Sequence, residues 1–107
     1  MAKFLIKASY SADGLKGLMK AGGTSRVNAV EKALQGVGGT IESFYFAFGG
    51  DDVYVVVDGP DNAGAMAMAA TIGSGGAMRD YETVVLLTPA EVDSAMSMTV
   101  DYVPPGG

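Results

Sequence analysis

The segment Thr40–Asp58, TIESFYFAFGGDDVYVVVD, decides the fold of this chain. Its first part alternates, because Phe44, Phe46 and Phe48 fall on one face of an extended strand and the intervening residues fall on the other. The letters GGDD that follow supply turn chemistry, since glycine tolerates positive φ and aspartate hydrogen-bonds nearby backbone. The valine-rich stretch 53–57 then makes a return strand. The segment therefore predicts a β-hairpin in the middle of the chain.

Strand and helix signals flank this hairpin on both sides. Before it, FLIKASY predicts a strand, and a helical stretch interrupted by Gly22-Gly23 follows. After it, Asp61 can cap an alanine-rich helix, and Thr88 opens a capping box with Glu91. The predicted order is a strand at 3–10, helices within 11–37, the hairpin, a helix at 61–75, a strand at 78–87, a helix at 88–98 and an extended tail at 99–107.

This βαββαβ order with a C-terminal helix predicts an α+β fold, a ferredoxin-like sandwich in one domain spanning residues 1–107. We expect an antiparallel sheet of strand order 4-1-3-2 with helices on one face only. The face under the helices is predicted to carry Phe4, Ile6, Ala8, Phe44, Phe46, Phe48, Val53, Val55 and Val57. The open face is predicted to carry Leu5, Lys7, Ser9, Ile41, Ser43, Tyr45, Tyr54 and Val56, with Tyr81, Thr83 and Val85 beside them.

The open face is too apolar and too rich in tyrosine for a surface that only meets water. Such a patch is typical of an interface, so we expect the chain to form homo-oligomers through this face. A domain of 107 residues also gains stability from association.

Composition excludes several classes of protein. The chain has no cysteine and no histidine, which removes disulfides, thiolate chemistry and serine–histidine triads, and argues against zinc. Its net charge is −5 and its basic residues are scattered, so we expect no nucleic-acid partner. The sequence shows no apolar run long enough for a membrane span and no signal-peptide pattern, which predicts a cytoplasmic protein without a membrane partner.

The segments FLIKASY, GGTSR, FYFAFGGDDVYVVVDGPD and VVLLTPAEVD together resemble the GYD-domain family of small bacterial proteins. In the glycine–tyrosine–aspartate signature of that family, Gly50 and Asp52 match and Asp51 stands at the tyrosine position. The resemblance spans nearly the whole chain and implies no specific biochemical function. It does imply a topology similar to that of the dimeric α+β-barrel proteins, whose sheets pack face to face and which include cofactor-free oxygenases and isomerases.

Five side chains are the candidate ligand-binding residues: Tyr10, Arg26, Tyr45, Tyr54 and Glu82. Tyr10 ends the first strand, and Arg26 opens the second helical segment, where a guanidinium could hold a carboxylate or phosphate in a bidentate manner. The alternative is a plain surface arginine, or an ion pair of Arg26 with Glu31, Asp13 or a neighbouring subunit. For Tyr45 and Tyr54 the alternative is packing in an interface.

We expect neither a metal nor a cofactor. Asp51, Asp52, Asp58 and Asp61 are explained by roles in turns and caps, and they form no calcium loop pattern. The favoured hypothesis is a protein that binds a small, anionic molecule between sheet and helices. A cofactor-free oxygenase or isomerase is one alternative, and a purely structural assembly subunit is the other. A cavity lined by Tyr10 and Arg26 would favour ligand binding or catalysis, whereas a filled core would favour the structural role.

Overall fold

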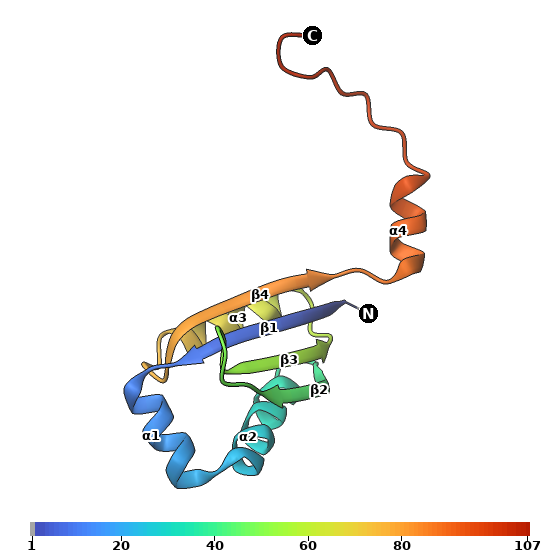
Figure 1. Ribbon diagram of the computed structural model, residues 1–107. Coiled ribbons are helices and arrows are strands. Elements are labelled where there is room, and N and C mark those ends of the chain that lie inside the picture. The colour runs from blue at the N-terminus through green and yellow to red at the C-terminus, as the bar shows by residue number, and fades with distance from the viewer. Residues whose placement is uncertain (1) are drawn as a thin grey trace.

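A computed structural model describes residues 2–107 and shows four strands and four helices in this part of the chain. Figure 1 labels these elements along the chain and shows a sheet with helices packed against it and a last helix that stands apart. The elements are β1 Lys3–Tyr10, α1 Ala12–Ala21, α2 Gly23–Gln35, β2 Thr40–Phe46, β3 Val53–Asp58, α3 Asn62–Gly73, β4 Met78–Leu86 and α4 Pro89–Met96.

The sheet has the strand order β2-β3-β1-β4, and all three neighbouring pairs are antiparallel. This is the predicted order, and it confirms the α+β fold class. β1 lies between β3 and β4, so its side chains have strands on both sides. The hairpin loop is closed by a hydrogen bond from the Ala47 amide to the Asp52 carbonyl, 2.8 Å long. A loop this short leaves only antiparallel pairing open to β2 and β3.

The core lies between the sheet and helices α1 to α3. Phe4, Ile6 and Ala8 of β1 alternate with half-buried residues, as do the three core-facing valines of β3, which confirms the predicted helix-covered face on these strands. Leu34 of α2 is fully buried and Met68 of α3 is 6% exposed. Removal of this apolar surface from water is the main force that holds the helices on the sheet.

Polar side chains cap three of the helices. The Ser11 hydroxyl accepts a hydrogen bond from the Gly14 amide, and the Asp61 carboxylate accepts one from the Gly64 amide. At α4 the predicted capping box is confirmed: the Glu91 amide donates to the Thr88 hydroxyl and the Thr88 amide donates to the Glu91 carboxylate. The hydrogen bond from the Thr88 amide holds the pKa of Glu91 below its usual value. Each cap satisfies backbone donors that the first helical turn leaves free.

The sequence predicts the wrong face of the sheet for three side chains of β4. Tyr81, Thr83 and Val85 lie opposite Ala8, Ile6 and Phe4 of β1, and directly paired residues share one face of a sheet. These three residues therefore lie on the helix-covered face. A one-residue shift of register moves every side chain to the opposite face, and only the pairing with β1 sets that register.

The prediction for Ile41 fails for a related reason. Ile41 lies opposite Val57 and packs against the core, because the pairing of β2 with β3 shifts between Ile41 and Ser43. Such an irregularity inserts a residue and changes the face on which the preceding side chain lies.

Two of the three hairpin phenylalanines are not in the core. Phe44 packs against it as predicted, but Phe46 is 41% exposed. Phe48 lies beyond the end of β2 and is fully exposed. The strand predicted to continue through Phe48 is therefore two residues too long at its end. Alternation in the sequence continues through Phe48, but the backbone pairing that would place this ring stops at Phe46.

The open face of the sheet is a mixture of apolar and charged side chains. Leu5, Val56 and Val84 form a half-buried row across three strands. Charged pairs lie on both sides of this row: Lys3 pairs with Glu42 and Asp58, and Lys7 pairs with Asp51 and Glu82. Exposed ion pairs of this kind contribute little to stability, so they serve mainly to keep the face hydrated.

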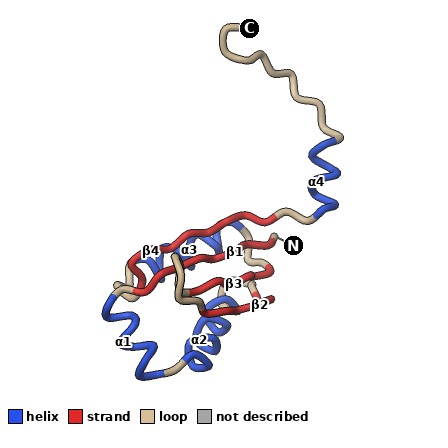
Figure 2. The backbone as a smooth tube through the Cα atoms, viewed as in Figure 1, coloured by secondary structure: helices blue, strands red, loops and turns tan. Residues whose placement is uncertain are grey.

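The chain after β4 leaves the sheet. Figure 2 shows α4 and the tail projecting as an arm, and no residue of α4 is buried. The helix ends at Met96, two residues before the predicted end, and residues 98–103 continue without regular structure. Within residues 2–107, no helix has both the length and the apolar character needed to cross a membrane.

Candidate functional site

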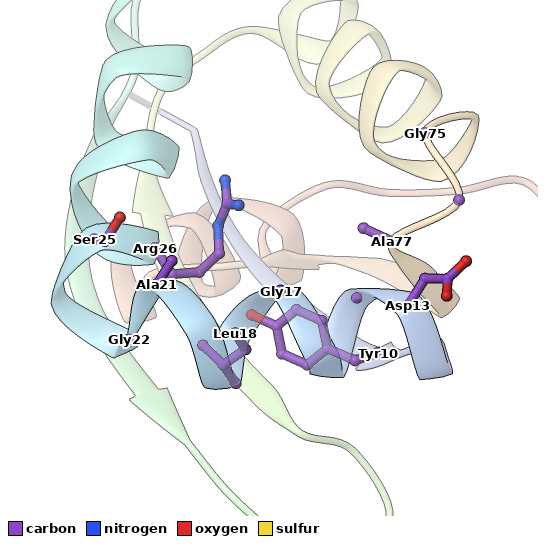
Figure 3. Close-up of a pocket in the computed structure, with 12 residues that line it drawn as sticks. Tyr10, Asp13, Gly17, Leu18, Ala21, Gly22, Ser25, Arg26, Gly75 and Ala77 are labelled. Carbon is purple, nitrogen blue, oxygen red and sulfur yellow. The ribbon is translucent and has the colours of Figure 1, made fainter.

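A cleft of about 330 Å³ opens where α1 and the start of α2 face the segment that joins α3 to β4. Figure 3 shows Tyr10 and Arg26 on this cleft, with Asp13 near its other end. Glycines at positions 14, 17, 22, 75 and 76 line much of it, so backbone rather than side chains forms large parts of the wall. Its volume is at the lower limit of typical small-molecule sites, which span roughly 300–1,000 Å³.

A second, much smaller hollow lies between the sheet and the helices. It measures about 30 Å³ and is lined mainly by apolar side chains, together with Tyr10, Tyr81 and Arg26. A space of this size holds about one water molecule or one methyl group. Because Tyr10 and Arg26 line both hollows, they form the boundary between the outer cleft and the inner chamber.

The hairpin loop positions Tyr10. The Tyr10 amide donates a hydrogen bond of 2.9 Å to the Asp52 carboxylate, and the hydroxyl of Ser9 donates to Asp51 and to the carbonyl of Gly50. These bonds tie the end of β1 to the loop, where the pairing with β4 becomes irregular between Ser9 and Tyr10. Both consecutive side chains are buried there, Ser9 beneath the loop and Tyr10 in the core. Asp52 therefore holds the backbone of Tyr10, and Asp51 holds the side chain of Ser9.

The Tyr10 hydroxyl is buried and has no hydrogen-bond partner among residues 2–107. Burial raises the pKa of Tyr10, and the nearby Arg26 guanidinium only partly offsets that effect. The phenol therefore stays protonated at neutral pH and can act as a hydrogen-bond donor. A buried donor without a partner is costly, which makes an oxygen acceptor in the adjoining cleft favourable.

Tyr81 presents a second buried hydroxyl without a partner in the described part of the chain. Burial also raises the pKa of Tyr81. Its side chain lies on the helix-covered face and lines the inner chamber with Tyr10. The sequence predicts Tyr81 on the open face of the sheet, which is wrong, so Tyr81 is absent from the predicted site residues. Its flanking residues Asp80 and Glu82 carried the signal, because charged neighbours on a strand indicate that the residue between them faces the other way.

Arg26 lies in the first turn of α2 and forms no ion pair with any acid among residues 2–107. The alternative of pairing with Glu31 or Asp13 of its own chain is therefore wrong, whereas the exposure of Arg26 agrees with the alternative of a surface arginine. The first turn of α2 holds no acidic residue, and the positive end of the helix dipole adds to the charge of the guanidinium. This part of the cleft favours an anion.

The other three predicted site residues lie elsewhere. Tyr45 and Tyr54 are cross-strand neighbours on the open face of the sheet, and Tyr45 is 70% exposed. Glu82 is on the same face, where its carboxylate lies 3.5 Å from the Lys7 ammonium. The structure thus brings Tyr10 and Arg26 together on the helix side and separates them from Tyr45, Tyr54 and Glu82.

No cluster of three or more potential metal-binding side chains occurs within residues 2–107. Asp52 accepts a hydrogen bond from the Tyr10 amide, and Asp61 caps α3. Asp51 accepts a hydrogen bond from the Ser9 hydroxyl, and Asp58 pairs with Lys3. The predicted cap role is confirmed for Asp61. The side chains of Asp51, Asp52 and Asp58 instead bind residues of β1.

Comparison with solved structures finds two similar chains. The crystal structure of FFRP-DM1 matches with a TM-score of 0.51 and 16% identity, covering 81% of this chain and 100% of that one. The hypothetical protein PHS023 from Pyrococcus horikoshii matches with a TM-score of 0.47 and 16% identity, covering 82% of this chain and 92% of the other. At this identity the first likeness supports the fold alone. No curated protein matches the chain.

The family model of the GYD domain matches residues 4–96, which include all of the sheet except Lys3, all four helices, and both Tyr10 and Arg26. The signature positions Gly50 and Asp52 lie in the loop that holds the end of β1. Since the match covers most of the chain and agrees with the resemblance seen in the sequence, this protein belongs to the GYD-domain family.

Proposed function

We propose that this protein binds a small organic anion in the cleft between α1, α2 and the α3–β4 segment. The observation that supports this most strongly is the pair formed by Tyr10 and Arg26. A buried phenol and a guanidinium meet at the same hollow, and within residues 2–107 the phenol has no hydrogen-bond partner and the guanidinium no ion pair. A carboxylate satisfies both, because guanidinium holds its two oxygens and phenol donates to one of them.

The size of the two hollows limits the ligand. The outer cleft of about 330 Å³ accommodates the body of a small molecule, whereas the inner chamber admits no more than a methyl-sized group. We therefore expect a short-chain or single-ring acid whose charged group lies at Arg26. The presence of a cavity lined by Tyr10 and Arg26 favours this function over that of a purely structural subunit.

A cofactor-free isomerase or oxygenase is the second candidate, and the position of Asp13 favours it. Asp13 lines the same cleft as Tyr10 and Arg26. A carboxylate there could accept a proton from a carbonyl compound, while the protonated phenol and the guanidinium stabilise the negative charge on oxygen. Catalysis would be identified if the wild type consumes an enolisable acid and Asp13→Asn still binds this acid but no longer consumes it.

Arg26→Ala should weaken binding of a carboxylate at least tenfold, because a charge-assisted hydrogen bond contributes about 1.5–3 kcal/mol. Thermal-shift screening of aliphatic and aromatic carboxylates, followed by calorimetry with the best of them, measures this loss. Lys32→Ala is the matched control: it removes the same charge from the same helix, and Lys32 is exposed and outside the cleft. Binding that survives in Arg26→Ala, or that falls equally in Lys32→Ala, contradicts the proposal.

Tyr10→Phe should separate binding from stability. The ring and its packing remain, so we expect unfolding free energy to stay the same or to rise by about 1 kcal/mol, because a buried hydroxyl without a protein partner is removed. Ligand affinity should fall in the same variant. Chemical denaturation and calorimetry on one preparation test both statements. A variant that loses stability but keeps full affinity would show that the hydroxyl is structural.

A further inference from the structure

The C-terminal arm, residues 88–107, exposes apolar side chains along its whole length. These are Val92, Met96, Met98, Val100, Tyr102 and Val103, and they are between 41% and 78% exposed. In α4, Val92 and Met96 are one turn apart on one side, whereas Glu91 and Asp93 lie toward other sides. A segment of this kind is amphipathic and lacks a surface to pack on.

The length of α4 makes such a surface necessary. The helix has eight residues and buries none of them against its own domain. Isolated helices shorter than about 12–15 residues are marginal in water even when their sequence is favourable. The capping box and Pro89 define where the helix begins, but capping alone does not offset the cost of forming so short a helix. Packing against an apolar surface would supply the missing stability.

A surface that fits lies between α3 and β4. This α3–β4 groove has a volume of about 290 Å³ and is lined by Phe4, Ala65, Met66, Ala69, Thr83 and Val85, with Asn62 at its end. Met66 is 66% exposed and Val85 is 62% exposed. The sequence of α3, NAGAMAMAATIG, has no charged residue on any side, and its small side chains allow another segment to approach closely. The groove shares no residue with the cleft at Tyr10 and Arg26.

The arm cannot easily reach the groove of its own chain. Thr83 and Val85 belong to the strand that leads directly into the arm, and only Leu87 separates β4 from the cap residue Thr88. Folding back would need a reversal at Leu87 and Thr88. Thr88 instead has φ −74° and ψ 158°, the extended conformation that a following proline favours. The arm accordingly points away from the sheet (Figures 1 and 2).

We propose that the arm of one copy packs in the α3–β4 groove of a second copy, and that two copies exchange arms in a symmetric dimer. The same two surfaces then meet twice, as closed two-fold symmetry requires. The apolar side of α4 lies against the uncharged α3, while the acidic side chains of the arm, Glu91, Asp93 and Asp101, stay in water. This interface is distinct from the open face of the sheet.

The test uses the full chain and two substitutions at exposed positions, Met96→Glu in the arm and Met66→Glu in the groove. Sedimentation velocity from 1 to 100 µM should show a wild-type dimer. Each single variant should associate at least about tenfold more weakly, because it buries an unpaired carboxylate at both contacts. An equimolar mixture of the two variants should recover part of the association, since one intact arm can still meet one intact groove. Met19→Glu, at an exposed apolar residue of α1 outside both surfaces, should leave the dimer unchanged.

Three outcomes overturn the proposal. In the first, the wild type is monomeric throughout the concentration range and therefore has no exchanged arm. The same holds if hydrogen exchange of backbone amides shows that α4 is protected within this monomer. A dimer that resists both glutamate variants but dissociates in Tyr45→Glu uses the open face of the sheet instead. Loss of association in both single variants without recovery in the mixture shows that arm and groove do not meet. Failure of ligand binding in the Arg26 experiments affects none of these results.

Discussion

Leu34→Ala is expected to lower the free energy of unfolding by about 2–5 kcal/mol, because it removes a fully buried side chain and leaves a cavity. Leu34 lies near the end of α2 and packs into the cluster formed by the core faces of β1 and β3 with Met68. Small domains are stable by only about 5–15 kcal/mol, so this single change removes a large part of that margin.

Urea denaturation followed by circular dichroism measures the loss. The control is Met19→Ala on α1, a similar truncation at a side chain that is 80% exposed, and it should change stability by less than about 0.5 kcal/mol. A comparable loss in both variants would mean that the burial of Leu34 in the core does not account for the effect, since helix propensity favours alanine at both positions.

Gly14→Ala is expected to destabilise the protein by about 1–3 kcal/mol through overpacking. A β-carbon at this position would overlap the carbonyl oxygen of Ala77 and lie 3.0 Å from the ring of Tyr10. The contact cannot relax locally, because the Ser11 amide donates to the same Ala77 carbonyl and the Ser11 hydroxyl donates to Gly76. We expect α1 to move away from the 76–77 segment, so thermal unfolding should occur at a lower temperature.

Gly17→Ala is the matched control for Gly14→Ala. Gly17 lies one turn further along α1, and within residues 2–107 no atom outside its chain neighbours and its own helix backbone comes within 4 Å of a β-carbon built there. The substitution should stabilise the protein by about 0.5–1 kcal/mol, the difference in helix propensity between glycine and alanine. If the two substitutions in this helix change stability in opposite directions, the tight approach to Ala77, and not the helix itself, requires glycine. Stabilisation by both variants would contradict the close packing of α1 on this segment.

The candidate site was partly predictable. Tyr10 and Arg26 are 16 positions apart, yet each occupies the end of an element, and a β–α unit brings such ends together. Tyr81 was not predictable in the same way. Its place in the inner chamber depends on its pairing with Ala8 of β1, which lies 73 positions earlier in the chain. The contact between Asp52 and the Tyr10 amide likewise joins residues that no local pattern connects.

The sequence by itself determined the elements, their order and the helix-covered faces of β1 and β3. Alternating Phe and Val positions, glycine turns and the Ser11, Asp61 and Thr88 caps are local signals, and local sterics and hydrogen bonds suffice to decide them. Only the tertiary structure decided which face of the sheet the side chains of β4 occupy, where Phe48 lies, and that Arg26 forms no ion pair with an acid among residues 2–107. These three features depend on strand register and on the packing of segments that are distant in the chain. A register shift of one residue would move every side chain of a strand to the opposite face of the sheet.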